Sequence, residues 1–207
     1  MSGRFITLEG GEGAGKSTQA ALLASWLREQ GKAVVETREP GGTPGADAIR
    51  DLLLANDVPL TATAEAHLFA AARADHVERL IAPALARGDW VICDRFVDSS
   101  LAYQGVAGEL GPEKVCAINE TAIGACMPDL TLLLRAGAAL GAARASARDG
   151  AARDRFSARE SAFHEAVAQA FDRFAQSEPG RFAIIDASGD IDSVAGAIRD
   201  TVKARLP

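Results

Sequence analysis

The sequence predicts an α/β fold, a three-layer α/β/α sandwich in which a five-stranded parallel sheet is covered by helices on both faces. The first observation behind this prediction is an alternation along the chain: short apolar, partly β-branched runs are followed by longer stretches of helical periodicity. The second is size and composition. The 207 residues, 48% hydrophobic and 24% charged, suffice for one domain with a real core and are too few for two ordinary domains. We therefore expect a single domain over residues 1–207.

The first strands and helices flank a glycine-rich segment. A strand is predicted over Arg4–Glu9, and the helix over Ser17–Gln30 has apolar residues at helical spacing. This helix stops at Gly31, a residue type that is typical of the position just beyond a helix end. A second strand over Ala33–Thr37 then precedes a helix over Ala46–Leu54.

The rest of the chain continues the alternation. A long helix is predicted over Ala64–Arg87, with a kink before Pro83, because proline lacks the N–H group that an α-helix uses. No segment repeats at a period of about 20–50 residues. The remaining elements, in order, are Trp90–Asp94 (strand), Glu113–Ala125 (helix), Leu130–Leu134 and Phe182–Asp186 (strands), and Asp190–Leu206 (helix).

Charge and cysteine content exclude several classes of partner. The net charge of -6 leaves no positive field around the molecule, so binding to a nucleic acid polymer or a membrane surface is not expected. No apolar run reaches the roughly 18–20 residues of a membrane span, and the N-terminus lacks the pattern of a signal peptide. The three cysteines, an odd number without Cys-x-x-Cys spacing, favour a cytoplasmic location.

A phosphate-binding loop is the strongest motif in the chain. Residues Gly10–Ser17 match G-x-x-x-x-G-K-[ST], follow an apolar strand and open an amphipathic helix, which is the setting the P-loop requires. Glycines let backbone N–H groups point inward at an anion, Lys16 neutralises the terminal phosphates, and the Ser17 hydroxyl ligates Mg²⁺. A dinucleotide motif does not fit, because Lys16 occupies the position of its third glycine. The sequence therefore predicts a P-loop NTPase fold.

Asp94 is the second expected ligand of the magnesium shell, with Ser17. It ends the apolar strand Trp90–Asp94, and open α/β sheets bind their ligands at the carboxyl ends of strands. The alternative is an aspartate that only caps a loop.

Motifs outside the P-loop distinguish a regulatory GTPase from a small-molecule kinase. A regulatory GTPase should carry a guanine-reading Asn-Lys-x-Asp motif, and the chain has none. Kinases that act on small molecules instead need arginines around the second phosphate, because two polyanions repel each other. The candidates are Arg38, Arg50, Arg73 and Arg95.

Several further motifs share one family. The segments Glu9–Ser17, Thr37–Thr43, Phe69–Arg73, Asp94–Phe96 and Ser99–Gly105 resemble those of bacterial thymidylate kinases in order and spacing, and the resemblance continues through Pro128–Thr131 and Phe163–Glu165. It implies transfer of the γ-phosphoryl group of ATP to dTMP, giving dTDP and ADP in dTTP biosynthesis, with Mg²⁺ as cofactor. It also implies a homodimer with the early helices as the contact surface.

The resemblance also implies roles for individual residues. Glu12 would hold the 3′-hydroxyl side of the dTMP sugar, Phe69 would stack on thymine, and Arg73 would hydrogen-bond a base carbonyl. Tyr103 would fill the space that a ribose 2′-hydroxyl needs. The 5′-phosphate would be bound by Arg38, Arg50 and Arg95, beside a cis Glu39–Pro40 peptide, and the remaining dTMP contacts would come from Ser99, Ser100 and Gln104. ATP would contact Gly10, Gly11, Glu12, Gly13, Ala14, Gly15, Lys16, Ser17, Thr18 and Arg144.

An arginine-rich segment at about 142–159 is the candidate lid. It has few large apolar side chains and an Asp149-Gly150 break, which indicates two helical pieces and an exposed loop. A solvated helical hairpin is the alternative. Gly13 and Ala14 leave the P-loop without the arginine found in one branch of the family, so the lid would supply the catalytic cation. The predicted catalytic set is Lys16, Arg95, Arg153 and Arg155, with Arg148 and Arg144 as second choices for the lid cation.

Three positions depart from the family pattern. Ser157 and Arg159 stand where acids are usual, with Glu160 as a possible substitute, and Arg135 replaces another acid. These changes bear on the lid and sugar contacts more than on the reaction.

Two alternatives to a thymidylate kinase stay open from the sequence: a neighbouring nucleoside-monophosphate or deoxynucleoside kinase, and a nucleotide-binding switch or inactive paralogue. An intact lysine, magnesium site and lid argue against a switch or inactive paralogue.

The three histidines are expected in helix packing or at the surface.

Overall fold

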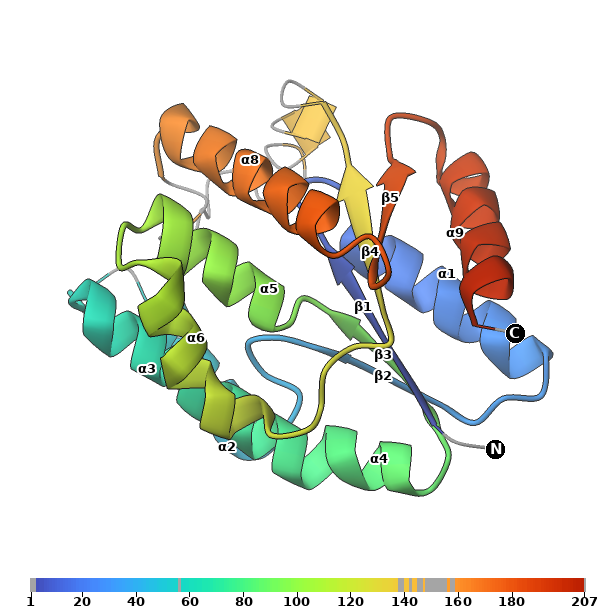
Figure 1. Cartoon of the computed structure of the whole chain (residues 1–207), viewed down its shortest axis with the longest axis horizontal. Helices are drawn as coiled ribbons and strands as arrows, with labels where there is room; N and C mark the ends of the chain where they lie inside the picture. The colour runs from blue at the N-terminus through green and yellow to red at the C-terminus, as the bar shows by residue number, and fades with distance from the viewer. Residues whose placement is uncertain are drawn as a thin grey trace.

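The protein is a five-stranded parallel sheet with helices on both faces (Figure 1). The computed structural model describes residues 3–55, 57–137, 140–141, 143–144, 147, 156 and 159–206. Every strand pair in the sheet is parallel, in the order β2-β3-β1-β4-β5. The strands are β1 (Arg4–Glu9), β2 (Val34–Arg38), β3 (Trp90–Asp94), β4 (Leu130–Arg135) and β5 (Phe182–Asp186). The predicted fold class is confirmed.

One face of the sheet is covered by α1 (Lys16–Glu29) and α9 (Ile191–Arg205). Successive side chains of a strand point to opposite faces, so Ile6 and Leu8 of β1 pack against these two helices while Phe5 packs on the other side. The inner strands β1, β3 and β4 are buried along most of their length for this reason, which is typical of a parallel sheet between helical layers, whereas the edge strand β2 is more exposed.

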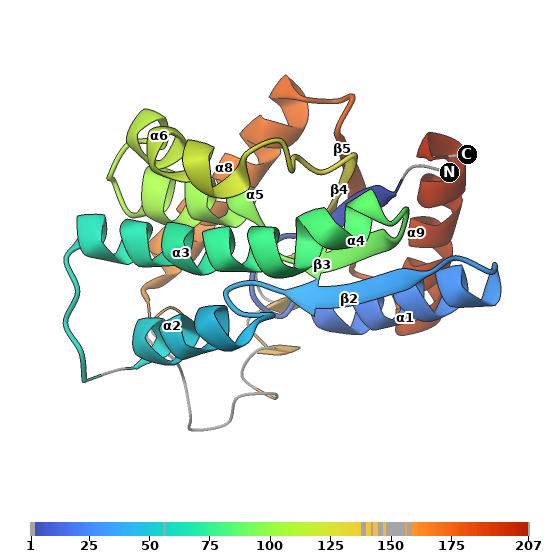
Figure 2. The ribbon, with the colours of Figure 1, turned by 90° about the horizontal axis from the view of Figure 1, so that it is seen from below.

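The opposite side is a thicker helical layer. Figure 2 shows α2 (Pro44–Leu54), α3 (Ala62–His76) and α6 (Pro112–Ile123) stacked together on the left, away from α1 and α9. Apolar residues such as Phe96 and Val91 join this layer to the sheet. Residues of α2, of α3 and of the segment after β3 line one cavity at the carboxyl edge of the sheet.

The predicted long helix is interrupted as expected before Pro83. The α-helix α3 gives way to a π-helical turn, η1 (Val77–Ile81), and the chain resumes as α4 (Ala82–Ala86). A proline removes one backbone donor and its ring crowds the preceding turn, and a π turn accommodates both effects without ending the helix.

Two helical segments were not predicted from the sequence. One follows β3 and comprises α5 (Val97–Ser100) and the π-helical η2 (Leu101–Ala107). The other is α8 (Ser161–Ser177), which packs on η2 and on β5. The predicted lid, 142–159, falls largely outside the described residues. In the described part of the chain, no helix is long and apolar enough to cross a membrane.

Candidate active site

A large cavity lies at the carboxyl ends of β1, β2 and β3. Its volume is about 1110 Å³, and its walls come from the loop after β1, the segments after β2 and β3, and the start of α9. Ligands of open α/β sheets bind at this edge, because the loops that leave the strands converge there. The fold therefore concentrates most predicted site residues around one space.

The loop between β1 and α1 builds one wall of the cavity. Gly10, Gly13 and Gly15 all have positive φ angles, a conformation that glycine adopts without steric cost. Lys16 opens α1 and is 7% exposed, and its Nζ atom donates to the carbonyls of Gly10 at 3.1 Å and Gly11 at 2.6 Å. Burial, and then the charge of Arg95, lower the pKa of Lys16 to about 7. An incoming phosphate favours the protonated form of this amine.

Ser17 and Asp94 meet across the cavity floor. The Ser17 hydroxyl donates to Oδ2 of Asp94, while the buried Oδ1 of Asp94 has no hydrogen-bond partner among the described residues. Mg²⁺ prefers hard oxygen ligands and keeps several of its waters. A hydroxyl beside a carboxylate with one uncommitted oxygen fits such an ion.

Arg95 connects the P-loop to the next wall of the cavity. Its backbone has a φ of 70°, and its Nη1 atom donates to the carbonyl of Gly10 at 3.2 Å and to Oγ of Ser99 at 3.1 Å. The guanidinium carbon lies 5.1 Å from the centre of the Tyr103 ring. The Gly10 carbonyl therefore accepts hydrogen bonds from both Lys16 and Arg95.

Two more arginines flank the turn after β2. The Glu39–Pro40 peptide is cis, as the sequence resemblance implies. Arg50 donates from Nη1 to the carbonyl of Pro40 at 2.7 Å, and the more exposed Arg38 pairs with Asp47 at 3.2 Å. Both arginines line the cavity, with Arg38 able to exchange its exposed partner for an anionic ligand.

Arg73 is held in a buried network below these groups. It is 2% exposed and donates to Oε2 of Glu39 at 2.8 Å, to Oγ of Ser100 at 3.0 Å and to Oδ1 of Asn119. His76 is also fully buried and contacts the other Glu39 oxygen at 3.1 Å. The planar guanidinium is therefore fixed in one orientation at the cavity wall.

Aromatic side chains form the apolar part of the cavity. The ring of Phe69 packs edge-on against Phe156, with centroids 5.6 Å apart, and Tyr103 and Gln104 lie close by on η2. The Gln104 amide donates to Oε1 of the nearly buried Glu65 at 3.1 Å. A flat ring such as a nucleobase fits between an aromatic face and these positioned polar groups.

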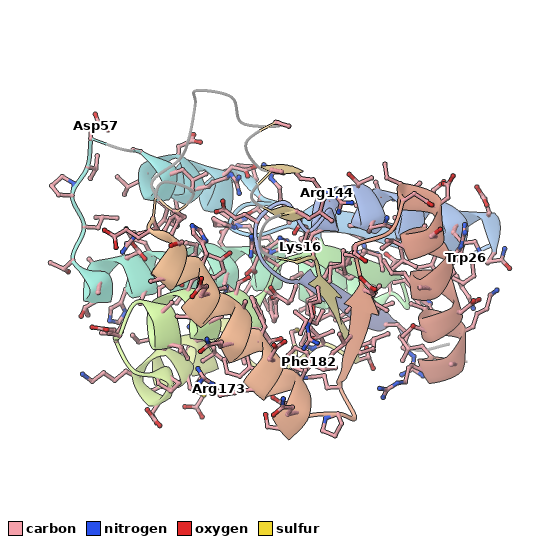
Figure 3. The ribbon with its side chains drawn as sticks, turned by 90° about the horizontal axis from the view of Figure 1, so that it is seen from above. Lys16, Trp26, Asp57, Arg144, Arg173 and Phe182 are labelled. Atoms are coloured by element: carbon pink, nitrogen blue, oxygen red, sulfur yellow. The ribbon has the colours of Figure 1, made fainter. Side chains whose placement is uncertain are left out.

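The far end of the cavity is formed by the loop after β5. Arg144 donates to the carbonyls of Ala187 at 2.9 Å and Gly189 at 3.2 Å. Figure 3 labels Arg144 and Lys16, whose side chains line the same cavity from different segments. Ala187 of this loop lines the cavity.

Most predicted site residues line this cavity, and a few do not. Gly10 and Gly11 are absent from its lining but bind Lys16 through their carbonyls. Arg148, Arg153 and Arg155 lie outside the described residues. The predicted residues that line the cavity are Glu12, Gly13, Ala14, Gly15, Lys16, Ser17, Thr18, Arg38, Glu39, Pro40, Arg50, Phe69, Arg73, Asp94, Arg95, Ser99, Ser100, Tyr103, Gln104 and Arg144.

Other residues of the site were missed in the sequence. Asn119 and His76 support Arg73 and Glu39 without a motif that marks them, and Glu9 supports the Arg95 turn. Gln19 lines the cavity and donates to the carbonyl of Ile191 at 3.0 Å. An acid directly before the first P-loop glycine is the one local signal that could have drawn attention to Glu9.

Two of the three positions that depart from the family pattern, Arg159 and Arg135, have local partners, and Ser157 lies outside the described residues. Arg159 lies 4.0 Å from the Glu65 carboxylate, and its guanidinium carbon is 5.0 Å from the centre of the Phe163 ring. Arg135 pairs with Asp172 of α8. These basic side chains are therefore paired near the cavity rim and on the surface.

Comparison with known proteins gives a consistent result. The family model described as thymidylate kinase matches residues 8–198. The chain is 51% identical over 208 residues to a thymidylate kinase of Rhizorhabdus wittichii, covering 100% of both chains. It is 50% identical over 206 residues to one of Bradyrhizobium sp., covering 99% of this chain and 91% of that protein. The crystal structure of thymidylate kinase from Ehrlichia chaffeensis matches with a TM-score of 0.79 at 30% identity, covering 98% and 99% of the two chains.

Proposed function

The chain belongs to the thymidylate kinase family and phosphorylates dTMP with ATP in dTTP synthesis, and from this premise we propose that its large cavity binds both nucleotides, phosphate to phosphate. The observation that carries this arrangement is the shared Gly10 carbonyl, which holds the P-loop lysine and Arg95 side by side. A donor phosphate at Lys16 and an acceptor phosphate at Arg95 would then be neighbours.

At the acceptor end, cations surround the 5′-phosphate of dTMP. Arg38, Arg50 and Arg95 bind it, because guanidinium groups donate in pairs to phosphate oxygens. Glu39 and Pro40 shape this end of the cavity, and Ser99 orients Arg95. The support for these roles is that all of these groups line one space.

The thymidine part of dTMP extends toward α3 and η2. Phe69 stacks on thymine while Arg73, Ser100 and Gln104 face its polar edge, and Tyr103 occupies the space of a ribose 2′-hydroxyl. Glu12 holds the 3′-hydroxyl side of the sugar. A site that positions buried hydrogen-bonding groups in advance discriminates strongly against a ligand that leaves them unpaired.

At the donor end, the P-loop binds the ATP phosphates. Backbone N–H groups of Gly10–Ser17 face the phosphates, Thr18 lines the same wall, and Lys16 neutralises the terminal oxygens. Arg144 and the loop after β5 border the adenine.

Mg²⁺ fits between Ser17 and Asp94. The Ser17 hydroxyl and the uncommitted Oδ1 of Asp94 would hold its coordination shell. When bound, the ion neutralises charge on the phosphates. The protein residues contribute alignment: a loose phosphoryl-transfer transition state requires reactants in line and compensated charge more than a strong base.

The lid completes the charge compensation. We infer that Arg153 or Arg155, with Arg148 as second choice, reaches the transferring phosphoryl group, which is worth roughly 10³–10⁵ in rate in related chemistry. Replacement of Arg155 by alanine should lower kcat by at least about 10²-fold with a modest change in KM. A near-normal kcat would move the role to Arg153 or Arg148.

A coupled assay for ADP release tests the acceptor assignment. With ATP and Mg²⁺, dTMP should support faster turnover than dUMP, dCMP, dGMP or thymidine. The Phe69→Ala and Arg50→Ala variants should raise the KM for dTMP, while Arg87→Ala, on the surface outside the cavity, should not. Equal KM values in all three variants would contradict the proposed dTMP pocket.

Assembly and location complete the proposal. We infer a cytoplasmic homodimer, with the early helices as the contact surface. The three cysteines are unpaired, which supports the cytoplasmic location. Leu52 of α2 is 39% exposed, which supports a contact surface on the early helices. Sedimentation equilibrium should give twice the chain mass, and a monomer at micromolar concentration would contradict the dimer. Cell fractionation should place the enzyme with cytoplasmic markers.

A further inference from the structure

Glu9 is a buried carboxylate that the phosphate-binding motif does not explain. It is the last residue of β1, it is 0% exposed, and it directly precedes the first glycine of the P-loop. Burial of an ionisable group is costly unless its oxygens find hydrogen-bond donors. The groups that donate hydrogen bonds to Glu9 therefore indicate its structural role.

The three donors to Glu9 among the described residues belong to the start of α5. Its Oε1 atom accepts from the backbone N–H of Phe96 at 2.8 Å and from that of Ser99 at 3.3 Å. Its Oε2 atom accepts from the Ser99 hydroxyl at 2.6 Å. One carboxylate on the central strand thus fixes a turn far along the chain.

Ser99 passes this restraint on to Arg95. The Arg95 guanidinium, which can only donate, gives one hydrogen bond to Oγ of Ser99 at 3.1 Å. When Glu9 is ionised, the single hydroxyl proton of Ser99 is therefore directed to it. The order of donors is then fixed, from Arg95 to Ser99 to Glu9.

The backbone of Arg95 also depends on this contact. Its φ of 70° is the left-handed region, which a residue with a side chain occupies only when its surroundings hold it there. The next N–H, that of Phe96, is the one bound to Glu9 at 2.8 Å. Glu9 therefore restrains Arg95 at both its backbone and its guanidinium.

We propose that Glu9 is a positioning residue for the acceptor phosphate, holding the Arg95 guanidinium in place through Ser99. The inference rests on the proposed function in one respect, the placement of Arg95 at the phosphate of dTMP. It predicts that loss of Glu9 lowers kcat/KM for dTMP much more than it raises the KM for ATP.

Glu9→Gln is the first test. Glutamine has the same size but only one acceptor oxygen, whereas the three donors occupy both oxygens of Glu9. In one orientation its amide nitrogen faces the backbone N–H groups of Phe96 and Ser99. In the other it replaces the oxygen that accepts the Ser99 proton, so the hydrogen bond between the two side chains would have to reverse. At a pH above the pKa of Glu9, the kcat/KM for dTMP should fall at least about 10-fold, with the KM for ATP changed less than about 3-fold.

Ser99→Ala interrupts the same relay without altering the buried carboxylate, so it keeps the test valid if Glu9→Gln folds poorly. It should also lower kcat/KM for dTMP, and the double variant should lose little more than Glu9→Gln alone. Fully additive losses would overturn the proposal.

Asp98→Asn is the matched control. Asp98 is 1% exposed and lies on α5 beside Ser99, but it pairs with Arg181 at 2.6 Å and not with Arg95. This variant should keep kcat/KM for dTMP within about 3-fold at a pH above the pKa of Glu9. A loss as large as that of Glu9→Gln would indicate general loosening of α5 and overturn the proposal.

Arg95→Lys separates this inference from the proposed function. If Arg95→Lys leaves kcat/KM for dTMP unchanged, the placement of Arg95 at the acceptor phosphate is wrong. If Arg95→Lys lowers kcat/KM for dTMP while Glu9→Gln and Ser99→Ala leave it unchanged, Arg95 acts at the acceptor phosphate without Glu9. Only the positioning role of Glu9 is then contradicted.

Discussion

Arg73 and Glu39 bury opposite charges beside the acceptor end of the cavity. Their side chains are 2% and 4% exposed. A buried ion pair is compatible with a stable fold only when its remaining hydrogen-bonding groups are also satisfied. Asn119, Ser100 and His76 satisfy them, so these residues form a rigid wall and not an adaptable one.

Replacing Arg73 by lysine tests this rigidity. The ammonium group has no planar fork and cannot reach Glu39, Ser100 and Asn119 together. We expect the free energy of unfolding to fall by about 2–3 kcal/mol in urea denaturation and the KM for dTMP to rise about 10-fold. Arg87→Lys, whose side chain is 60% exposed and pairs with Asp89, should change neither quantity. Similar results for both variants would contradict the assignment.

The pKa of Glu9 makes stability depend on pH. Burial, and then the nearby carboxylate of Asp98, raise it from 4.5 to about 7. Between these values the folded protein holds a proton that the unfolded chain releases, so the free energy of unfolding falls as pH rises, by about 3 kcal/mol for this group. Urea denaturation across this range should show a smaller fall for Glu9→Gln. Equal pH slopes for the two proteins would show that Glu9 does not titrate this way.

Residues proposed to contact the nucleotides were easier to predict than those that support them. Lys16, Arg38 and Phe69 belong to motifs whose chemistry is directed at a ligand. Glu9 and Asn119 instead bind other side chains or backbone groups from distant segments. Their partners are set by the three-dimensional fold, and no local pattern in the sequence carries that information.

Among the elements, the strands were predicted to within one residue. Parallel strands buried on both faces are continuous apolar runs with polar or glycine-rich ends, so their limits are marked in the sequence. The α5–η2 segment was missed because it is short, rich in small and polar residues, and buried around much of its circumference. α8 does have an amphipathic pattern, with Val167, Ala170 and Phe171 buried, but it directly follows the arginine-rich segment.

The junction of β1 and the P-loop gives a prediction at this scale. Gly10 has a φ of 136°, and a Cβ atom there would collide with the carbonyl oxygen of Leu134 in β4. Gly10→Ala should therefore lower the free energy of unfolding by at least about 2 kcal/mol. Gly11→Ala is the control for stability, because a Cβ atom there meets no described atom within 4 Å. Equal stability of the two variants in urea would contradict the model of this junction.

The charge balance of the cavity differs from that of the whole molecule. The net charge is -6, whereas six basic and five acidic side chains line the cavity, which leaves its lining a small positive excess. A net negative molecule disfavours long polyanions, whereas the arginines of the cavity attract small ones. The basic residues of the cavity are Lys16, Arg38, Arg50, Arg73, Arg95 and Arg144.

Ionic strength should therefore affect substrate capture. Raising the salt concentration from about 0.05 to 0.5 M shortens the range of the cavity field, so the KM for dTMP should rise several-fold while kcat changes little. The Arg38→Gln variant should show a weaker dependence, since Arg38 is exposed at the cavity. Arg28→Gln, which removes a partner of Glu36 outside the cavity, should retain the dependence of the unaltered protein. An identical salt response in the unaltered protein and both variants would contradict a role of the cavity charges in dTMP capture.

The carbonyl oxygen of Gly10 has a thermodynamic consequence for the pair of substrates. It accepts hydrogen bonds from Lys16 at 3.1 Å and from Arg95 at 3.2 Å. When a phosphate binds one of these cations and breaks its hydrogen bond, the oxygen keeps only the hydrogen bond from the other cation. The binding free energy of each nucleotide then includes a contribution set by its partner. Because coupling between two ligands is reciprocal, ATP alters the affinity for dTMP by the same factor as dTMP alters the affinity for ATP.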